Sequence, residues 1–228
     1  GLHRAVWDLR WEGAARLENA KIDLGDPTEG PLAVPGTYRL RLSADGRTEE
    51  ATLSVLPDGR SRATAADRQA QLAFALELRA DLNRVVADIG EVRAIQAQAD
   101  DLAQRLVGDG RAAGLVAAAN RVSRSAAALE ARLHNPKAEI VYDILAQRGG
   151  TQLHSNLVFL YISAVWGEGA PTMGVREVAA ELEALIADLE SKLAELKSGE
   201  LADLEQQARA LNLPRVLLKK PIESEELD

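Results

Sequence analysis

The chain has 228 residues, enough for one large domain or two small ones, since domains usually contain about 100 to 200 residues. Its composition, 46% hydrophobic and 27% charged, is typical of a globular protein, and no apolar run approaches the roughly 18 residues that a membrane span requires. The absence of cysteine excludes disulfides, thiolate zinc sites and cysteine nucleophiles. The formal charge of −8 opposes non-specific binding to nucleic acid. We therefore expect neither a membrane span nor a nucleic-acid partner.

The N-terminal quarter carries the two-residue period of β-strands. Apolar and polar side chains alternate over residues 37–42 and 51–55, and Asp45-Gly46 between them favours a type I′ hairpin turn. Residues 2–10 show a similar alternation. This pattern predicts three strands, with the following side chains facing a core: Tyr38, Leu40 and Leu42.

From Thr64 onward the period becomes helical, with apolar residues every three or four positions. Thr64 and Asp67 resemble a capping box. The periodicity predicts helices over residues 65–107, 115–133, 138–147 and 151–166, and a last long helix from residue 172 that is interrupted at Gly199.

These elements predict an α+β fold that is predominantly α. We expect a short antiparallel β-sandwich portion, followed by an antiparallel helical bundle with two long and two shorter helices. We place the β domain in residues 1–60, the bundle in 61–213 and a tail in 214–228, where an apolar anchor should precede a disordered acidic end.

No residue pattern identifies a catalytic site, a metal site or a cofactor site. The three histidines, His3, His134 and His154, lie in different predicted elements without metal-ligand spacing, so surface or partly buried positions are favoured. The loop that contains Asp23, Asp26 and Glu29 has carboxylates for calcium but lacks the order of an EF-hand loop.

Other polar patterns also have a structural explanation. Gly149-Gly150 precedes a predicted helix and could cradle a phosphate, but no Gly-Lys-Ser/Thr follows and helix punctuation is favoured. His154 and Ser155 are adjacent, yet the sequence has no nucleophile elbow. The acidic residues of the last helix indicate a solvated face: Glu181, Glu183, Asp188 and Glu190.

An aromatic group occurs in a chain that is otherwise poor in aromatics: Phe159, Tyr161 and Trp166. These side chains could line a ligand pocket, but their helical spacing favours packing into a core.

Several strings resemble known families. Residues 1–10 (GLHRAVWDLR) and 30–42 (GPLAVPGTYRLRL) resemble the end of an immunoglobulin-like domain of the flagellar hook-capping type. Residues 143–161 (DILAQRGGTQLHSNLVFLY) are similar to the C-terminal region of bacterial exported proteins with sortilin-like or BNR-repeat β-propellers, often labelled glycosyl hydrolases. The repeat signature of such propellers is absent from this chain, so the resemblance carries over no catalytic residue.

The resemblance implies a non-catalytic accessory module of a secreted or periplasmic protein. Because the chain begins with Gly1 and shows no signal sequence, we expect it to be a piece of a longer chain. Seven strands of a sandwich need about 100 residues, so residues 1–57 would form an incomplete one. We expect helices, another chain or further strands to cover the face that carries Trp7, Tyr38 and Leu53.

Three functions follow as hypotheses. The first is a protein interaction module that docks against the upstream propeller or another protein. The second is carbohydrate binding or assistance to hydrolysis, which predicts Trp7 or Trp166 near Asp23, Asp26 or Glu29 in an open cleft. The third is a self-associating helical scaffold, which predicts an exposed apolar stripe on a long helix. The sequence leaves the oligomeric state open.

Overall fold

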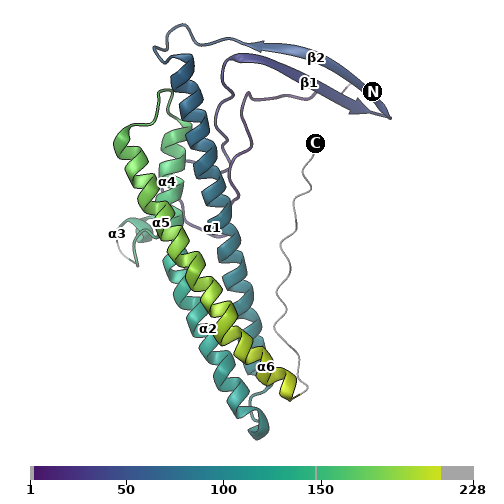
Figure 1. Cartoon of the computed structure of the whole chain (residues 1–228), viewed down its shortest axis with the longest axis vertical. Coiled ribbons are helices and arrows are strands. Elements are labelled where there is room, and N and C mark those ends of the chain that lie inside the picture. The colour runs from purple at the N-terminus through teal and green to yellow at the C-terminus, as the bar shows by residue number, and fades with distance from the viewer. Residues whose placement is uncertain (1–2, 147, 212–228) are drawn as a thin grey trace. The chain divides into compact units, whose positions relative to one another are not determined.

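The computed structural model describes residues 3–146 and 148–211. In these residues the chain is mainly helical with one two-stranded antiparallel sheet, which confirms the α+β, predominantly α prediction (Figure 1). The chain divides into two compact units. Unit 1 comprises Gly1–Asn83 and Ser155–Glu183, and unit 2 comprises Arg84–His154 and Ala184–Asp228. The domain boundary proposed near residue 60 stays a prediction, and the tail at 214–228 lies outside the described residues.

The sheet of unit 1 is a hairpin of β1 (Gly36–Ala44) and β2 (Arg47–Val55). Its turn residues both have positive backbone φ, 49° at Asp45 and 73° at Gly46. A type I′ turn requires this conformation at both central positions, and glycine adopts it without steric cost. The hairpin prediction is therefore confirmed in position and in turn geometry.

The third predicted strand is wrong, because described residues 3–10 form no strand and only Arg10 makes an isolated bridge, to Leu32. Leu9 has a φ of 62°, which interrupts the extended conformation that a strand needs. Trp7 instead packs edge-on against Tyr38, with 5.2 Å between ring centroids.

Two coil segments of unit 1 cross at close range. The Trp11 N–H donates to the Pro31 carbonyl at 2.9 Å, and the Ala14 N–H donates to the Pro27 carbonyl at 2.7 Å. At Gly30 an added Cβ would overlap the Trp11 carbonyl oxygen, so the crossing requires glycine there. These contacts fix the coil that precedes the hairpin.

Helix α1 (Ala65–Arg105) contributes to both units, and its apolar stripe is buried as predicted. The capping box is confirmed at its start. The Thr64 N–H donates to Asp67 Oδ2 at 2.8 Å, and the Asp67 N–H donates to Thr64 Oγ1 at 3.1 Å. Two orphan backbone donors of the first turn are thereby satisfied.

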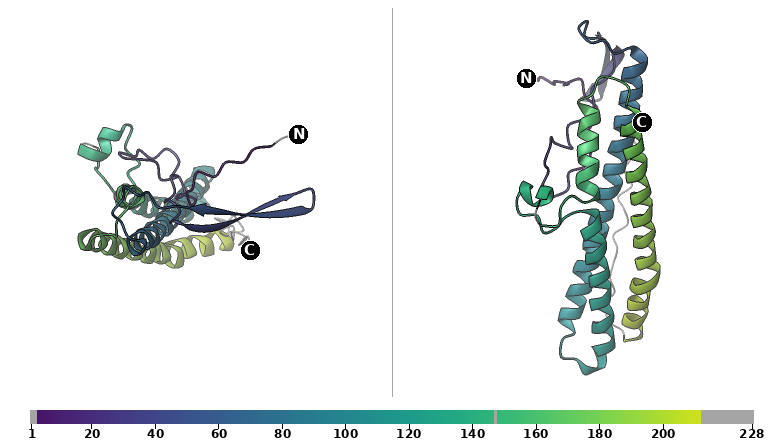
Figure 2. Two further views of the ribbon diagram at one scale, coloured as in Figure 1. Left: turned by 90° about the horizontal axis from the view of Figure 1, so that it is seen from above. Right: turned by 90° about the vertical axis from the view of Figure 1, so that its left-hand side faces the viewer.

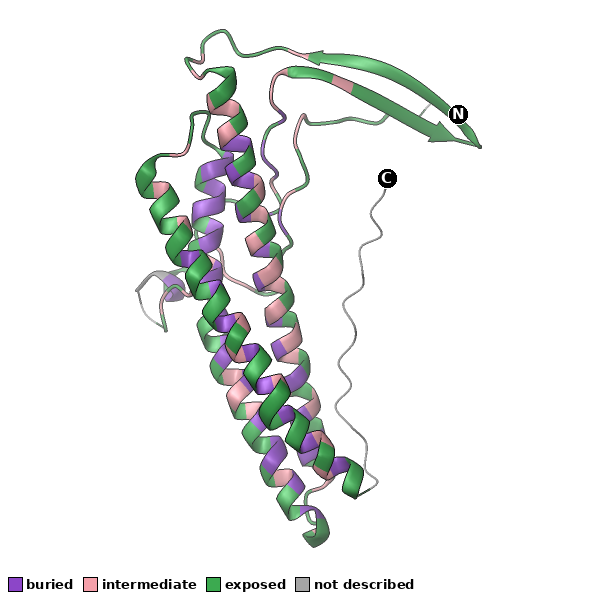
Figure 3. Cartoon of the chain, viewed as in Figure 1, coloured by how far each residue is buried: buried purple, intermediate pink, exposed green. Residues whose placement is uncertain are grey.

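Unit 1 also contains most of α4 (Leu153–Val165) and the first half of α5 (Met173–Leu196). Helix α4 is mostly buried, as Figure 3 shows. In unit 1 the Tyr161 hydroxyl donates to the Glu29 carbonyl at 2.9 Å, which ties this helix to the N-terminal coil. The buried Gln71 amide donates to the Ala164 carbonyl and ties α4 to α1.

In unit 2 the second half of α1 lies beside α2 (Ala113–Leu133) and the second half of α5, as the views in Figures 1 and 2 show. A short 3₁₀ turn, η1 (Gly110–Ala112), precedes α2. Helix α5 does not end at Gly199: it passes through a π-helical turn, η2 (Lys197–Leu201), into α6 (Ala202–Ala210). A single wide turn accommodates the interruption that the sequence predicts there.

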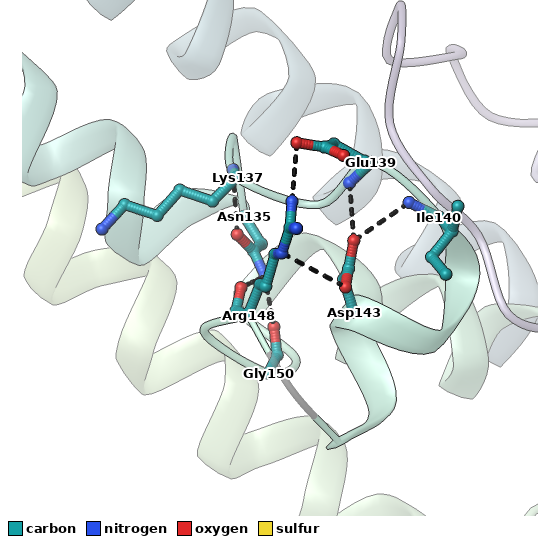
Figure 4. A network of polar contacts seen from close by, with 7 residues as sticks. All are labelled: Asn135, Lys137, Glu139, Ile140, Asp143, Arg148 and Gly150. Atoms are coloured by element: carbon teal, nitrogen blue, oxygen red, sulfur yellow. Dashed lines mark hydrogen bonds and ion pairs between the residues drawn. The ribbon is translucent and has the colours of Figure 1, made fainter.

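A loop of unit 2 between α2 and α4 holds the short helix α3 (Val141–Ala146). Asn135 Nδ2 donates to the carbonyls of Arg148, at 2.7 Å, and Gly150, at 3.0 Å (Figure 4). Asp143 accepts from two backbone N–H groups, at 2.9 and 3.1 Å, which lowers the pKa of its carboxyl. Gly149 and Gly150 both have positive φ in this network. They form a turn between helices, which fits the predicted helix punctuation rather than a phosphate cradle.

Candidate interaction surface

The hairpin has one apolar and one polar face. Side chains alternate along a strand, and directly paired residues share a face. Tyr38 pairs with Leu53, Leu40 with Ala51 and Leu42 with Glu49 on the first face. The second face carries Thr and Ser side chains with two arginines of β1 and Glu50 of β2. Only the first face of the hairpin is therefore suited to pack against another apolar surface.

The apolar face is exposed, which corrects the expectation that it faces a core. Leu40 is 43% exposed, Leu42 66% and Leu53 36%, and the hairpin is exposed almost throughout in Figure 3. Among the described residues, Trp7 on Tyr38 is the ring contact that this face makes, and no described helix covers it. From the sequence we expect helices, another chain or further strands to cover this face. The described helices do not cover it, which leaves another chain or further strands.

The polar face is balanced internally. Arg41 Nε donates to Glu50 Oε1 at 3.1 Å, and Arg39 lies 3.9 Å from the same carboxylate. Ser43 and Thr48 are hydrogen-bonded at 3.0 Å. These exposed pairs contribute little to stability. They satisfy the polar groups within the hairpin, so this face needs no second protein to do so.

An open cavity of about 210 Å³ lies at the base of the hairpin in unit 1. Val55 belongs both to the strand and to the cavity wall. The rest of the wall is mainly apolar, and it includes Leu9, Leu32, Val34, Pro35, Leu56 and Pro57. Five polar or charged side chains also line it: Asp58, Ser61, Arg68, Gln71 and Glu168. Leu56 is 80% exposed. The apolar face and this cavity form one continuous surface, which we call the hairpin surface.

A second surface feature of unit 1 surrounds Trp166. Its indole N–H donates to Glu29 Oε2 at 3.2 Å, and Arg10 binds the other oxygen of that carboxylate at 2.8 Å. Trp166 is 53% exposed, and Phe159 is exposed as well, so the prediction of core packing is wrong for both; it is confirmed for Tyr161. Asp26 is not part of this cluster, since its Oδ1 accepts from the Thr28 N–H and hydroxyl in a local turn that lowers its pKa.

The histidines of unit 2 are more buried than predicted. Arg93 donates to Glu130 Oε1 at 2.7 Å and to His134 Nε2 at 2.9 Å, so that ring nitrogen is an acceptor. Burial, and then the Arg93 charge, lower the pKa of His134. His154 is 1% exposed, and its Nε2 has no hydrogen-bond partner. Burial, together with His134 and Arg93, lowers its pKa to about 4.

The acidic side chains of α5 differ partly from the predicted solvated face. In unit 2, Arg132 of α2 donates to Asp188 at 2.9 Å, and Arg84 of α1 binds Glu190 through two nitrogens at 3.0 Å. These two carboxylates therefore connect helices. Half-buried Asp88 lies near Glu190, and burial and the neighbouring carboxylates raise its pKa to about 6.

Metal ligation, membrane crossing and serine activation each require a particular arrangement of the described residues. Among residues 3–146 and 148–211, no group of three or more histidines and carboxylates is placed to hold a metal. In the same residues no helix is both long and apolar enough to cross a membrane. His154 Nε2 makes no hydrogen bond, to the adjacent Ser155 or to any other described residue.

Comparisons with protein families, curated proteins and solved structures find no match to this chain. We therefore infer the function from the surfaces described above.

Proposed function

We propose that this chain is a non-catalytic interaction module that binds another protein through the hairpin surface. The observation that carries the proposal is the exposed apolar face of β1 and β2, which continues into the cavity at their base. Contiguous exposed apolar surface beside balanced polar groups is typical of protein interaction sites.

The resemblance of the sequence supports a more specific form of the proposal. The hairpin would be the end of an immunoglobulin-like β-sandwich, and strands of a longer polypeptide would cover its apolar face. The chain would then be the accessory module of a secreted or periplasmic β-propeller protein of the sortilin-like or BNR-repeat type. The upstream propeller region would be the first partner to test.

The test is size-exclusion chromatography with mass detection of the chain mixed with that upstream region. We expect a complex with the wild-type chain and no complex with Leu40→Asp or Leu42→Asp, because each places a charge in the apolar face. Thr52→Asp is the matched control on the polar face and should bind normally. Equal binding by all variants, or no wild-type complex, would contradict the proposal.

Carbohydrate binding is a second candidate function, favoured by the position of Trp166. This exposed ring lies against Glu29 and Arg10, so a tryptophan and a loop carboxylate meet here, while the open cleft that the hypothesis also requires stays a prediction. An aromatic platform beside hydrogen-bonding side chains suits an apolar sugar face with hydroxyls at its rim. Retention on polysaccharide columns should fall for Trp166→Ala and persist for Trp11→Ala, which changes another exposed tryptophan. Equal retention would reject this candidate.

The helical scaffold hypothesis has less support. The apolar stripe of α1, which self-association through this helix would need at the surface, is buried. On α5, the other long helix, Val178 and Leu185 are exposed, but the remaining leucines of its stripe are buried.

A further inference from the structure

We propose that the outer edge of β2 pairs with β2 of a second copy of this chain, antiparallel and around a two-fold axis at Ala51. This inference rests on the hairpin alone and is independent of the partner proposed above. It assigns a role to the strand edge, whereas the proposed function uses the strand face.

The hairpin has an open edge along β2 at which a further strand can pair. In the described residues the sheet contains β1 and β2 only, each nine residues long. An isolated two-stranded hairpin is marginally stable in water, and a free edge is a template for pairing with another chain. Alternate residues of β2 direct their backbone N–H and C=O groups to this open edge.

The side-chain pattern restricts how two copies can pair. A two-fold axis through a residue keeps both apolar faces on the same side of the joined sheet, whereas an axis between two residues would place apolar side chains beside polar ones. Ala51 is the middle residue of β2 (Arg47–Val55), so an axis there pairs the whole strand. An axis at Glu50 would instead bring two like charges together.

The Ala51 register places no like charges opposite each other. It pairs Thr48 with Ser54 and Glu50 with Thr52 on the polar face, and a hydroxyl pair such as Thr48 with Ser54 stabilises neighbouring strands. Glu50 remains balanced by Arg41 of its own hairpin, at 3.1 Å.

The edge of β1 is less suitable for the same symmetry. The middle residue of β1 is Leu40, and an axis there would set Arg39 of one copy opposite Arg41 of the other, twice. The charges therefore favour a second copy on β2. The product is a four-stranded sheet whose two apolar faces become one.

A cysteine at the axis tests this register directly, because the natural chain has no cysteine. Directly opposed residues of antiparallel strands have Cα atoms about 4.5 to 5.5 Å apart, within the range of a disulfide. We expect Ala51→Cys to form a disulfide-linked dimer under mild oxidation at least tenfold faster than Ser43→Cys, an exposed control on β1. Equal rates would overturn the proposed register.

The mass of the wild-type chain provides the second measurement. We expect it to rise with concentration from 24.5 kDa towards twice that value, and Ala51→Lys to weaken the dimer at least tenfold by placing two charges at the axis. A monomer at every concentration, or a dimer that Ala51→Lys leaves intact, would overturn the proposal. Circular dichroism would establish that these exposed positions leave the fold unchanged. Leu40→Asp and Ala51→Lys both place a charge in the apolar face. Thr52→Asp lies on the polar face and sets a carboxylate opposite Glu50 of the second copy, so it should weaken the dimer and leave partner binding intact; failure of either proposal is thereby distinguishable from failure of the other.

Discussion

Replacement of His154 by leucine should remove a defined part of the acid sensitivity of this fold. The side chain is 1% exposed, its Nε2 has no partner, and the groups that act on it in unit 2 are His134 and Arg93. Protonation therefore places a new positive charge beside another histidine and an arginine, with no acceptor to compensate it.

The sign and size follow from the pKa. The pKa of His154 is lowered from 6.5 to about 4 in the folded chain, so the unfolded chain binds more protons between these values. The stability that the uncharged His154 ring contributes is fully present above pH 6.5 and is lost as the pH falls through about 4. The full difference corresponds to about 3 kcal/mol of unfolding free energy.

Urea unfolding followed by helical circular dichroism, from pH 4 to 7.5, gives the measurement. His154→Leu should show a weaker decline of unfolding free energy towards acid than the wild-type chain, by about 3 kcal/mol over the range. The lowered pKa of His134 also reduces stability towards acid, whereas the raised pKa of Asp88 increases it. Both groups are present in the wild-type chain and in His154→Leu, so their contributions cancel in the difference between the two. His3→Leu, at an exposed position, should follow the wild type.

Identical pH dependence of His154→Leu and the wild-type chain would refute this reasoning. A nuclear magnetic resonance titration of the His154 ring gives an independent check, since a midpoint near 6.5 would show that the ring is not desolvated.

Three further substitutions test the packing of the chain by urea unfolding. Arg93→Ala should lower the unfolding free energy by about 2 to 3 kcal/mol because it leaves Glu130 buried without its partner, and Glu130→Gln added to it should restore part of the loss. Asp88→Asn should stabilise the fold by about 1 kcal/mol at pH 7 and have little effect below pH 4, since a raised pKa costs stability only where the carboxyl is ionised; equal effects at both pH values would contradict this. Gly30→Ala should destabilise the coil crossing by at least about 1 kcal/mol, whereas Gly59→Ala, with open space around it, should be nearly neutral; equal losses would reject the requirement for glycine at the crossing.

Local sequence signals predicted the parts of the fold that depend on nearby residues. The Asp45-Gly46 turn needs positive φ at two adjacent positions, and the Thr64–Asp67 box needs only residues three apart, so both could be recognised without tertiary information. The helix spans follow from periodicity for the same reason. The strand predicted over residues 2–10 failed because alternation alone does not show the left-handed φ at Leu9.

The candidate surface could be predicted only in part. Alternation identified the apolar face of Tyr38, Leu40 and Leu42, but not that it is open, because exposure depends on which segments fold back over it. The burial of His154 and the approach of Glu29 to Trp166 depend on contacts between residues distant in sequence. No short motif carries such information.

Deuterium uptake by backbone amides of residues 36–55 tests the central claim most directly. The measurement compares this chain alone with its complex with the upstream region. We predict that hairpin amides exchange rapidly in the isolated chain, measured at a concentration where it is monomeric, and at least tenfold more slowly in the complex, while the amides of α2 change little. Unchanged exchange across the hairpin in a complex that forms would contradict the assignment of this surface to partner binding.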